Sequence, residues 1–403
     1  MIDYKEIKLV NKVLKSKKIS QFVGKKSKRF YGGRYVRLFE KNLQNFFNVK
    51  HAIVVNSWTS GLICCVGATG IRPGDEVIVT PWTMSATVMS ILHWNAIPVF
   101  VDIESDSFNI DPKKIENKIT KKTKLIMFAD IFGNPANYKE IKRLAKKYNL
   151  KVIADSAQAP GIKFRGKYCG TITELGGLSF NYHKHIHTGE GGVIFTNNNK
   201  LARKTKLLRN HGENVVNKKD TQILSNMIGF NFRMGEIEAA IGIEQLKKLK
   251  KILIKKQNLA KYLHANLKKF RGIQLINIKN FRNHAFYIFP IVIDLKIIKS
   301  KRSEIVKMIR QTFKQRIIIE GYQNIHKLPI FQEKIAYGGN NFPWNLNKKV
   351  KYNYKKLNLH VAEELHEKSF IGILMCKYNL NFNDIDKLTK GFEKTWKKIK
   401  FIN

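Results

Sequence analysis

A single lysine stands among histidines and glycines in the segment SFNYHKHIHTGEGG, which covers residues 179–192. A lysine whose pKa is lowered by burial can act as a nucleophile and form a Schiff base with a carbonyl compound. The glycines that follow Lys184 let the backbone turn sharply into the next apolar run. A solvated surface position is the alternative for any one lysine in so basic a chain, so the residues that accompany Lys184 must decide.

Two further polar segments directly follow apolar runs. Residues 57–61, Ser-Trp-Thr-Ser-Gly, follow the run AIVVN and open a helical stretch. Hydroxyl groups and free backbone N–H groups at a helix start either bind a phosphate or only cap the helix. Asp155 ends the apolar run KVIAD, and a buried carboxylate needs a cation or hydrogen-bond donors. Asp155 therefore either meets a cation, such as a pyridinium nitrogen, or caps the next helix.

These segments require a sheet that brings the ends of several strands together. Between residues 51 and 197, apolar runs alternate with helical stretches, which predicts an α/β fold with a mostly parallel seven-stranded sheet covered by helices. Ligands of such sheets bind beyond the carboxyl ends of the strands, where all three polar segments lie. The predicted strands are 52–56, 76–80, 97–103, 124–130, 151–155, 177–180 and 191–196.

The length of 403 residues favours two packed domains. Residues 1–250 are predicted to form the large domain, in which a long helix begins near Gly235. Residues 251–403 are predicted to form a smaller α+β domain, with strands at 286–294 and 316–320. The large domain includes an amphipathic N-terminal helix, whose apolar side holds Ile2, Ile7, Val10 and Val13.

The composition narrows the classes of function. Lysine and arginine number 74 against 30 aspartates and glutamates, a net charge of +44 that could attract nucleic acid or anionic lipid. The basic runs are scattered, however, and no helix-turn-helix, zinc-finger or RNA-recognition signature is present. We expect no specific nucleic-acid partner, although salt-sensitive binding of polyanions stays open. The chain has no run of about 18 apolar residues, so we expect no membrane partner.

Neither the cysteines nor the histidines predict a metal site. His183, His185 and His187 alternate and would share one face of a strand, but no further ligand pattern accompanies them. No C-x-x-C pair occurs, which favours reduced structural thiols in a cytoplasmic protein. The four cysteines are Cys64, Cys65, Cys169 and Cys376.

The order of the motifs resembles the DegT/DnrJ/StrS family of sugar aminotransferases, which use pyridoxal 5'-phosphate and have fold type I of the aspartate aminotransferase superfamily. The resemblance spans nearly the whole chain. It rests on residues 32–36, 39–40, 56–57, 74–79, 98–102, 155–158, 179–180, 184, 188–192, 209–212, 229–234 and 362–365.

The resemblance implies a role for each matching residue. Lys184 would be the Schiff-base lysine and the base that moves a proton between substrate and cofactor. Asp155 would pair with the pyridinium nitrogen and so make the ring an electron sink, and Gln158 would lie beside the ring. The residues that would hold the phosphate are Ser57, Trp58, Thr59, Ser179 and, from a neighbouring subunit, Asn231. The last of these implies a homodimer with shared sites.

Two positions depart from the family pattern. Trp58 stands where relatives usually have glycine, so the phosphate site must be shaped differently. Met84 stands where relatives tend to have an aromatic residue, and either Met84 or Trp82 would pack against the cofactor ring.

Some relatives carry histidine in place of the reactive lysine and act as dehydratases. Lys184 lies in the lysine register, five residues before Gly189, which favours transamination.

The reaction implied by the resemblance moves an amino group from glutamate or glutamine to a nucleotide-linked 4-keto-6-deoxyhexose, for lipopolysaccharide, other surface polysaccharides or glycans. Residues 341–344 and 362–366 keep a keto-inositol of the scyllo-inosose type as the second substrate class. A regulatory relative without catalysis and a polyanion-binding protein are alternatives of another class. The expected substrate-binding residues are Tyr322, Arg233 and His326, although a helix-cap or surface position is the alternative for His326.

Overall fold

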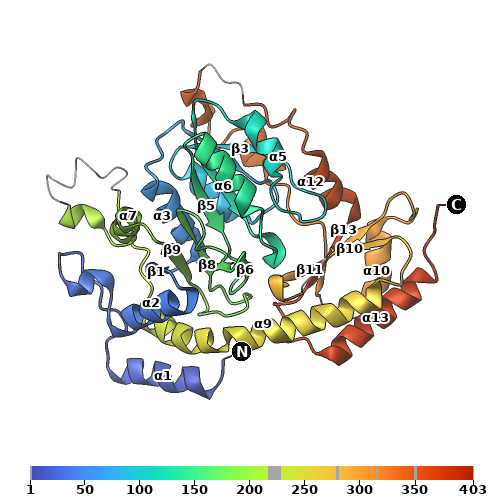
Figure 1. The fold of residues 1–403 in the computed structure, drawn as a ribbon, viewed down its shortest axis with the longest axis horizontal. Coiled ribbons are helices and arrows are strands. Elements are labelled where there is room, and N and C mark those ends of the chain that lie inside the picture. Colours follow the sequence, from blue (N-terminus) through green and yellow to red (C-terminus); the bar gives the residue numbers. More distant parts are fainter. Residues whose placement is uncertain (1, 217–227, 278–280, 314–315, 349–351, 403) are drawn as a thin grey trace.

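The computed structural model describes residues 2–216, 228–277, 281–313, 316–348 and 352–402. Its largest sheet has seven strands, and Figure 1 shows how helices surround it. The strand order is β1-β9-β8-β5-β4-β2-β3. All neighbouring pairs from β8 to β3 are parallel, whereas β9 is antiparallel to both β1 and β8. The mostly parallel sheet predicted from the sequence is therefore confirmed. The strands are β1 (His51–Val55), β2 (Glu76–Val79), β3 (Ile97–Phe100), β4 (Thr123–Ala129), β5 (Lys151–Asp155), β8 (Leu175–Ser179) and β9 (Gly192–Thr196).

Helices cover both faces of this sheet, which explains why its strands are almost continuously apolar. Successive strand side chains point to opposite faces, so Ile53 and Val55 join one core while Ala52 and Val54 join the other. The first core includes residues of α3 (Trp58–Ala68), α4 (Ser85–Leu92) and α7 (Asn199–Arg209). The second includes residues of α2 (Arg34–Phe47), α6 (Tyr138–Lys147) and α9 (Glu236–Leu267).

The C-terminal part of the chain forms a second, antiparallel sheet with the order β10-β11-β13-β12. Its strands are β10 (Ile273–Leu275), β11 (Ile288–Ile293), β12 (Ile318–Glu320) and β13 (Phe370–Leu374). The predictions at 286–294 and 316–320 correspond to β11 and β12, whereas β10 and β13 were not predicted. The remaining elements are β6 (Lys163–Phe164), β7 (Lys167–Tyr168), α5 (Pro112–Ile115), α10 (Arg302–Thr312), α11 (Pro329–Gln332), α12 (His360–Glu364) and α13 (Phe382–Trp396).

One long helix connects the two parts of the chain. Helix α9 begins at Glu236, directly after the predicted start at Gly235, and continues for 32 residues (Figure 1). Its first half packs on α2, and its later residues, from Leu259 onward, join the core of the smaller sheet. The domain boundary predicted at 250/251 lies within this continuous helix, so both parts share it.

The N-terminal helix α1 (Tyr4–Lys15) is present, but only Val10 and Val13 of the predicted apolar side turn toward the protein. Val13 is fully buried, whereas Ile2 and Ile7 are 43% and 52% exposed. The helix also packs on α9 through a polar contact, because the buried Glu6 carboxylate accepts hydrogen bonds from Gln245 and Lys248. No helix in the described part of the chain is both long and apolar enough to cross a bilayer.

Candidate active site

The polar segments predicted from the sequence meet in one pocket at the carboxyl end of the central sheet. Ser57 follows β1, Asp155 ends β5 and Ser179 ends β8. The pocket has a volume of about 170 Å³. It is lined by Ser57, Trp58, Thr59, Leu62, Thr83, Met84, Ala86, Ala129, Asp155, Ala157, Gln158, Ser179, Asn181, His183, Lys184, Glu190, Tyr287 and Tyr322.

The first turn of α3 forms one wall. Ser57 is the N-cap residue, and its hydroxyl accepts a hydrogen bond from the Ser60 backbone N–H at 3.0 Å. The cap leaves the N–H groups of Trp58 and Thr59 without a partner inside the helix, as at every helix start. These groups, together with the positive end of the helix dipole, favour an anion at this wall.

Asp155 is a buried carboxylate held by donors on both oxygens. Its Oδ1 accepts hydrogen bonds from the Trp58 indole N–H at 2.7 Å and from the Ala157 backbone N–H at 3.2 Å. Its Oδ2 accepts one from the Thr87 hydroxyl at 2.7 Å. An ionised carboxylate has about four lone-pair sites, and these contacts use three of them. One site therefore remains for a cationic or N–H group in the pocket.

Lys184 lies in the loop between β8 and β9 and reaches the pocket from the side of the smaller sheet. Its Nζ atom is 4.2 Å from the centre of the Tyr287 ring. Burial lowers the pKa of Lys184 from 10.5 to about 8, although the nearby charge of Asp155 opposes the shift. A substantial fraction of this amine is therefore neutral slightly above neutral pH, as a nucleophile or a base must be.

The Gly-Glu-Gly-Gly turn after Lys184 is tied back to this loop. The Asn181 side chain donates to the Glu190 carboxylate at 2.6 Å, and the Thr188 hydroxyl donates to the Glu190 carbonyl. Gly191 has a φ of 158°, and a Cβ there would lie 2.5 Å from the Thr188 hydroxyl oxygen. The glycine is needed because the backbone passes so close to its own preceding turn.

The smaller C-terminal part closes the pocket with Tyr322. The Gln158 amide donates to the Tyr322 hydroxyl at 3.0 Å and accepts from the Phe132 backbone N–H at 2.7 Å. Burial raises the pKa of Tyr322 to about 12, so its hydroxyl keeps its proton and can donate a hydrogen bond to a ligand. Tyr322, which the sequence indicated as a substrate-binding residue, therefore lines the pocket beside Gln158.

The structure distinguishes between the two residues that were candidates for packing on a cofactor ring. Met84 is the N-cap residue of α4, lines the pocket and is 57% exposed. Trp82 lies two residues earlier and is fully buried against Phe108 and Phe370. Met84 is thus the side chain that a ligand in the pocket can reach.

The three histidines near Lys184 do not converge on one point. His183 lines the pocket, and burial, with the charge of Lys184, lowers its pKa to about 4. His185 is buried and its Nε2 lies 2.8 Å from the Ala285 carbonyl oxygen. Among the residues that the structure describes, no group of three histidine, cysteine, aspartate or glutamate side chains is placed to hold a metal ion.

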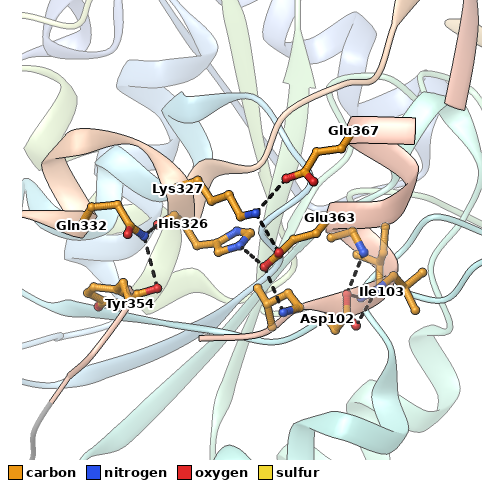
Figure 2. Close-up of polar contacts among 11 residues, drawn as sticks. Asp102, Ile103, His326, Lys327, Gln332, Tyr354, Glu363 and Glu367 are labelled. Atoms are coloured by element: carbon orange, nitrogen blue, oxygen red, sulfur yellow. Dashed lines mark hydrogen bonds and ion pairs between the residues drawn. The ribbon is translucent and has the colours of Figure 1, made fainter. Parts of the chain in front are cut away.

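His326 lies outside the pocket, and its ring is fully buried. Its Nε2 is 3.0 Å from Glu363 Oε1, and the other oxygen of Glu363 pairs with Lys327 at 2.7 Å. Nearby, Asp102 accepts hydrogen bonds from the backbone N–H groups of Val361 and Ala362 (Figure 2). The structure therefore gives His326 a buried contact with α12, neither access to a substrate nor the surface position considered as the alternative.

Asn231 and Arg233 also lie outside the pocket of this single chain. Asn231 is exposed and pairs with Asn210 in an isolated β-bridge. Arg233 Nε donates to the Asn231 side-chain oxygen at 2.7 Å, and its Nη1 donates to the Asn210 side chain. The side chains of Asn231 and Arg233 therefore form a polar cluster away from the pocket.

Several pocket residues were missed by sequence reasoning. Tyr287 was included in a predicted strand but not recognised as a pocket residue, and Thr83, just before α4, also lines the pocket. Thr87 of α4 does not line the pocket, but its hydroxyl donates a hydrogen bond to the pocket residue Asp155. Thr83 and Thr87 share a hydrogen bond of 2.8 Å, which continues to Asp155. Nothing in their local sequence distinguishes them from ordinary strand and helix residues, because only the packing of distant segments brings them to the pocket.

Replacing Glu363 by glutamine is expected to make the free energy of unfolding less dependent on pH in acid. Burial alone would raise the pKa of Glu363, but hydrogen bonds from Lys327, His326 and the Leu359 N–H lower it from 4.5 to about 2. Such a carboxylate stabilises the fold above its unfolded pKa, and the contribution is lost as the pH falls through the folded value.

Urea unfolding between about pH 5 and pH 3 measures this effect. The wild type should lose more unfolding free energy over this interval than Glu363→Gln. The control is Glu367→Gln, which removes the other, more exposed partner of Lys327. Equal losses in the wild type and Glu363→Gln would show that Glu363 does not carry the effect.

The lowered pKa of Lys184 predicts how the lysine reacts with an aldehyde. The rate at which the apoprotein takes up pyridoxal phosphate, followed by visible absorbance, should rise with pH through about 8, because the neutral amine is the reactive form. A free lysine side chain would show its rise near pH 10.4 instead. Lys184→Arg serves as the control and should retain no covalently bound cofactor after reduction with borohydride.

Comparison with known proteins gives one consistent result. The model of the DegT/DnrJ/EryC1/StrS aminotransferase family matches residues 2–374. A relative from Campylobacter jejuni strain 81-176, UDP-4-amino-4,6-dideoxy-N-acetyl-beta-L-altrosamine transaminase, is 35% identical over 297 residues, which are 72% of this chain and 74% of the relative.

Two solved structures share the fold. Helicobacter pylori PseC, an aminotransferase involved in the biosynthesis of pseudoaminic acid, matches with a TM-score of 0.79 and 27% identity, over 98% of this chain and 97% of that one. NtdA from Bacillus subtilis, solved with bound cofactor PMP, matches with a TM-score of 0.80 and 28% identity, over 98% of this chain and 83% of that one. These matches confirm the predicted fold type.

Proposed function

Because the chain belongs to the DegT/DnrJ/EryC1/StrS aminotransferase family, whose members depend on pyridoxal phosphate, we propose that it transfers an amino group from glutamate or glutamine to a nucleotide-linked 4-keto-6-deoxyhexose. The observation that carries the proposal is the pairing of Lys184 and Asp155 in one pocket. A lysine with a pKa of about 8 and a buried carboxylate with a free lone-pair site face the same small volume.

The pocket has suitable groups for each part of the cofactor. The first turn of α3 and Ser179 would bind the phosphate, and Asp155 would hold the proton on the ring nitrogen. Met84 would pack against a ring face from the exposed side. Asn181, at the pocket wall, has a buried side-chain oxygen without a partner among the described residues, a second sign that a ligand completes the site.

When bound, the cofactor supplies an electron sink for the carbon that carries the amino group. The protein supplies the proton transfers and the exclusion of water. The Lys184 amine is the base that would take the proton from this carbon and return it, since its pKa lies close to working pH. Tyr322, which keeps its hydroxyl proton, would donate a hydrogen bond to a ligand that lies beside Gln158.

Two observations support the choice of sugar substrate. The Campylobacter jejuni relative is named for a UDP-linked 4-amino-4,6-dideoxy sugar, which corresponds to amination at carbon 4 of a 6-deoxy keto sugar. The pocket of about 170 Å³ is smaller than the roughly 300–1,000 Å³ of typical ligand sites. A nucleotide-linked sugar would therefore extend from the pocket over a surface where the net charge of +44 favours its phosphates.

The keto-inositol alternative receives no support from the pocket. The segments that suggested it, residues 341–344 and 362–366, contribute no lining residue. Trp344 packs on Tyr354 instead, and the start of α12 binds Asp102.

The four cysteines are unpaired, which favours a reducing, cytoplasmic location for the protein. The role of the family points to the supply of amino sugars for surface polysaccharides.

Incubation with a substrate panel tests the proposed reaction. The purified holoprotein, with glutamate or glutamine, is given UDP- and GDP-linked 4-keto-6-deoxyhexoses and a keto-inositol, and aminated products are identified by mass spectrometry. We expect amination of a nucleotide-linked sugar. Lys184→Ala should lose at least about 10²-fold in rate, the smallest usual contribution of a general base. A protein that binds the cofactor but aminates nothing would be a regulatory relative. A protein that only binds polyanions would show no cofactor chromophore, and its affinity for polyanions would fall steeply with salt concentration.

A homodimer with shared sites is the second part of the proposal. Asn231 is exposed outside the pocket of its own chain, so it can reach a cofactor phosphate only in the site of a second subunit. Mixed dimers of Lys184→Ala and Asn231→Ala chains test this arrangement. If sites are shared, each mixed dimer contains one site with both intact residues, so mixing and reassembly should restore activity that neither parent has.

The control for this experiment is a mixture of Lys184→Ala with Asp155→Asn chains. Both residues line the pocket of the same chain, so no mixed dimer between these variants has an intact site. Failure of the first mixture to regain activity, when its dimers form, would rule out a contribution of Asn231 across the interface.

A further inference from the structure

The side chain of Trp58 turns inward beneath the first turn of α3, although it stands where relatives usually have glycine. Its ring is 5% exposed. A Cβ at Gly61 would lie 2.6 Å from this ring, and one at Gly177 would lie 2.4 Å from it. At Gly192 a Cβ would lie 2.7 Å from the Trp58 Cα atom. Glycines on α3 and β8 thus leave the room that the indole occupies, and Gly192 of β9 leaves room for the Trp58 backbone.

In this position, the indole N–H contacts the Asp155 carboxylate. It donates to Asp155 Oδ1 at 2.7 Å, a distance typical of a hydrogen bond strengthened by charge. From the opposite side, the Thr87 hydroxyl donates to Oδ2 at 2.7 Å. Thr87 is itself fixed by a 2.8 Å hydrogen bond with Thr83. The two donors approach different oxygens, so the plane of the carboxylate cannot rotate without breaking one of these contacts.

We propose that Trp58 is a positioning residue, which holds the Asp155 carboxylate so that its remaining lone pair faces the ring nitrogen of the cofactor, with Thr87 as the second support. The inference rests on the role proposed above for Asp155. Phenylalanine at position 58 would fill most of the same space and remove only the donor. The effect of Trp58→Phe on the cofactor should therefore exceed its effect on packing.

Trp94 provides a matched control within the same chain. It is 8% exposed, and its indole N–H donates to the Ile63 carbonyl at 2.8 Å. It also packs against a glycine of α3, since a Cβ at Gly67 would lie 2.2 Å from its ring. Trp94 lines no part of the pocket. Trp94→Phe therefore removes an indole hydrogen bond and a similar apolar surface without touching Asp155.

Cofactor affinity separates positioning from packing. Pyridoxal phosphate is titrated into the apoproteins of the wild type, Trp58→Phe, Trp94→Phe and Thr87→Val, with thermal melting of each apoprotein as the measure of packing. We expect Trp58→Phe to weaken cofactor binding about tenfold, the value of one hydrogen bond to a charged group. Thr87→Val should weaken it in the same sense, while Trp94→Phe stays within about twofold of the wild type. Equal weakening by Trp58→Phe and Trp94→Phe would overturn the inference.

Asp155→Asn distinguishes failure of this inference from failure of the proposed function. In the Asp155→Asn background, Trp58→Phe should have little further effect, because the two residues act as one unit. If Asp155→Asn alone leaves cofactor binding unchanged, the proposed role of Asp155 is wrong. If it weakens binding while Trp58→Phe behaves like Trp94→Phe, only the role of Trp58 is wrong.

A spectroscopic signature tests the contact even if Trp58→Phe fails to fold. In protein labelled with 15N-tryptophan, the indole proton of Trp58 should resonate downfield of an indole bonded to a neutral carbonyl, such as that of Trp94. Asp155→Asn should move the Trp58 signal upfield by several tenths of a part per million or more and leave the Trp94 signal in place. An unmoved Trp58 signal would contradict the proposed hydrogen bond.

Discussion

The pocket depends on a carboxylate that is shielded from water and surrounded by hydrogen-bond donors. Asp155 ends a central strand of the main sheet and is only 6% exposed. An unpaired buried charge costs several kcal/mol, so a carboxylate at this place is stable only when donors surround it. The indole of Trp58 and the hydroxyl of Thr87 supply two of these donors from two different helices. The site is therefore built into the packing of α3 and α4 on the sheet and not added at its surface.

The buried environment of the pocket also determines the pKa of Lys184. Burial favours the neutral amine, and the field of Asp155 favours the charged one, so the pKa settles near 8. A lysine in water would be almost wholly charged at the same pH, and a lysine buried without Asp155 would be neutral. The balance allows one amine to accept and release protons near neutral pH. Tyr287, whose ring lies beneath the Nζ atom, favours the charged form without adding a formal charge.

Sequence reasoning found the residues that follow the strands and missed the residues that support them. Ser57, Asp155 and Ser179 are recognisable because parallel strands deliver their carboxyl ends to one edge of the sheet. Thr87 reaches Asp155, and Tyr287 reaches the pocket, only through packing between distant segments, which leaves no local pattern. The same limit applies to Trp58, since part of the space for its indole comes from Gly177 on the distant strand β8.

Errors at the level of the fold have similar causes. The apolar periodicity of α1 is real, but a buried contact of Glu6 with α9 decides which side faces the protein. The strand β13 was missed because its five residues, FIGIL, carry an apolar run too short to separate from a helix end. Trp82 and Met84 could not be separated by sequence because the start of α4 at Ser85 decides which of them points outward.

The segment after β12 shows how the smaller part of the chain determines the shape of the pocket. Tyr322 touches the rings of Trp82 and Phe132 at the pocket wall. Three residues later, the Ile325 N–H donates to the Pro81 carbonyl at 3.0 Å, and His326 then meets Glu363 of α12. His326 is therefore four residues from the pocket along the chain and fixed on a different element. One short segment after β12 thus contacts the pocket through Tyr322, the loop before α4 through Ile325 and α12 through His326.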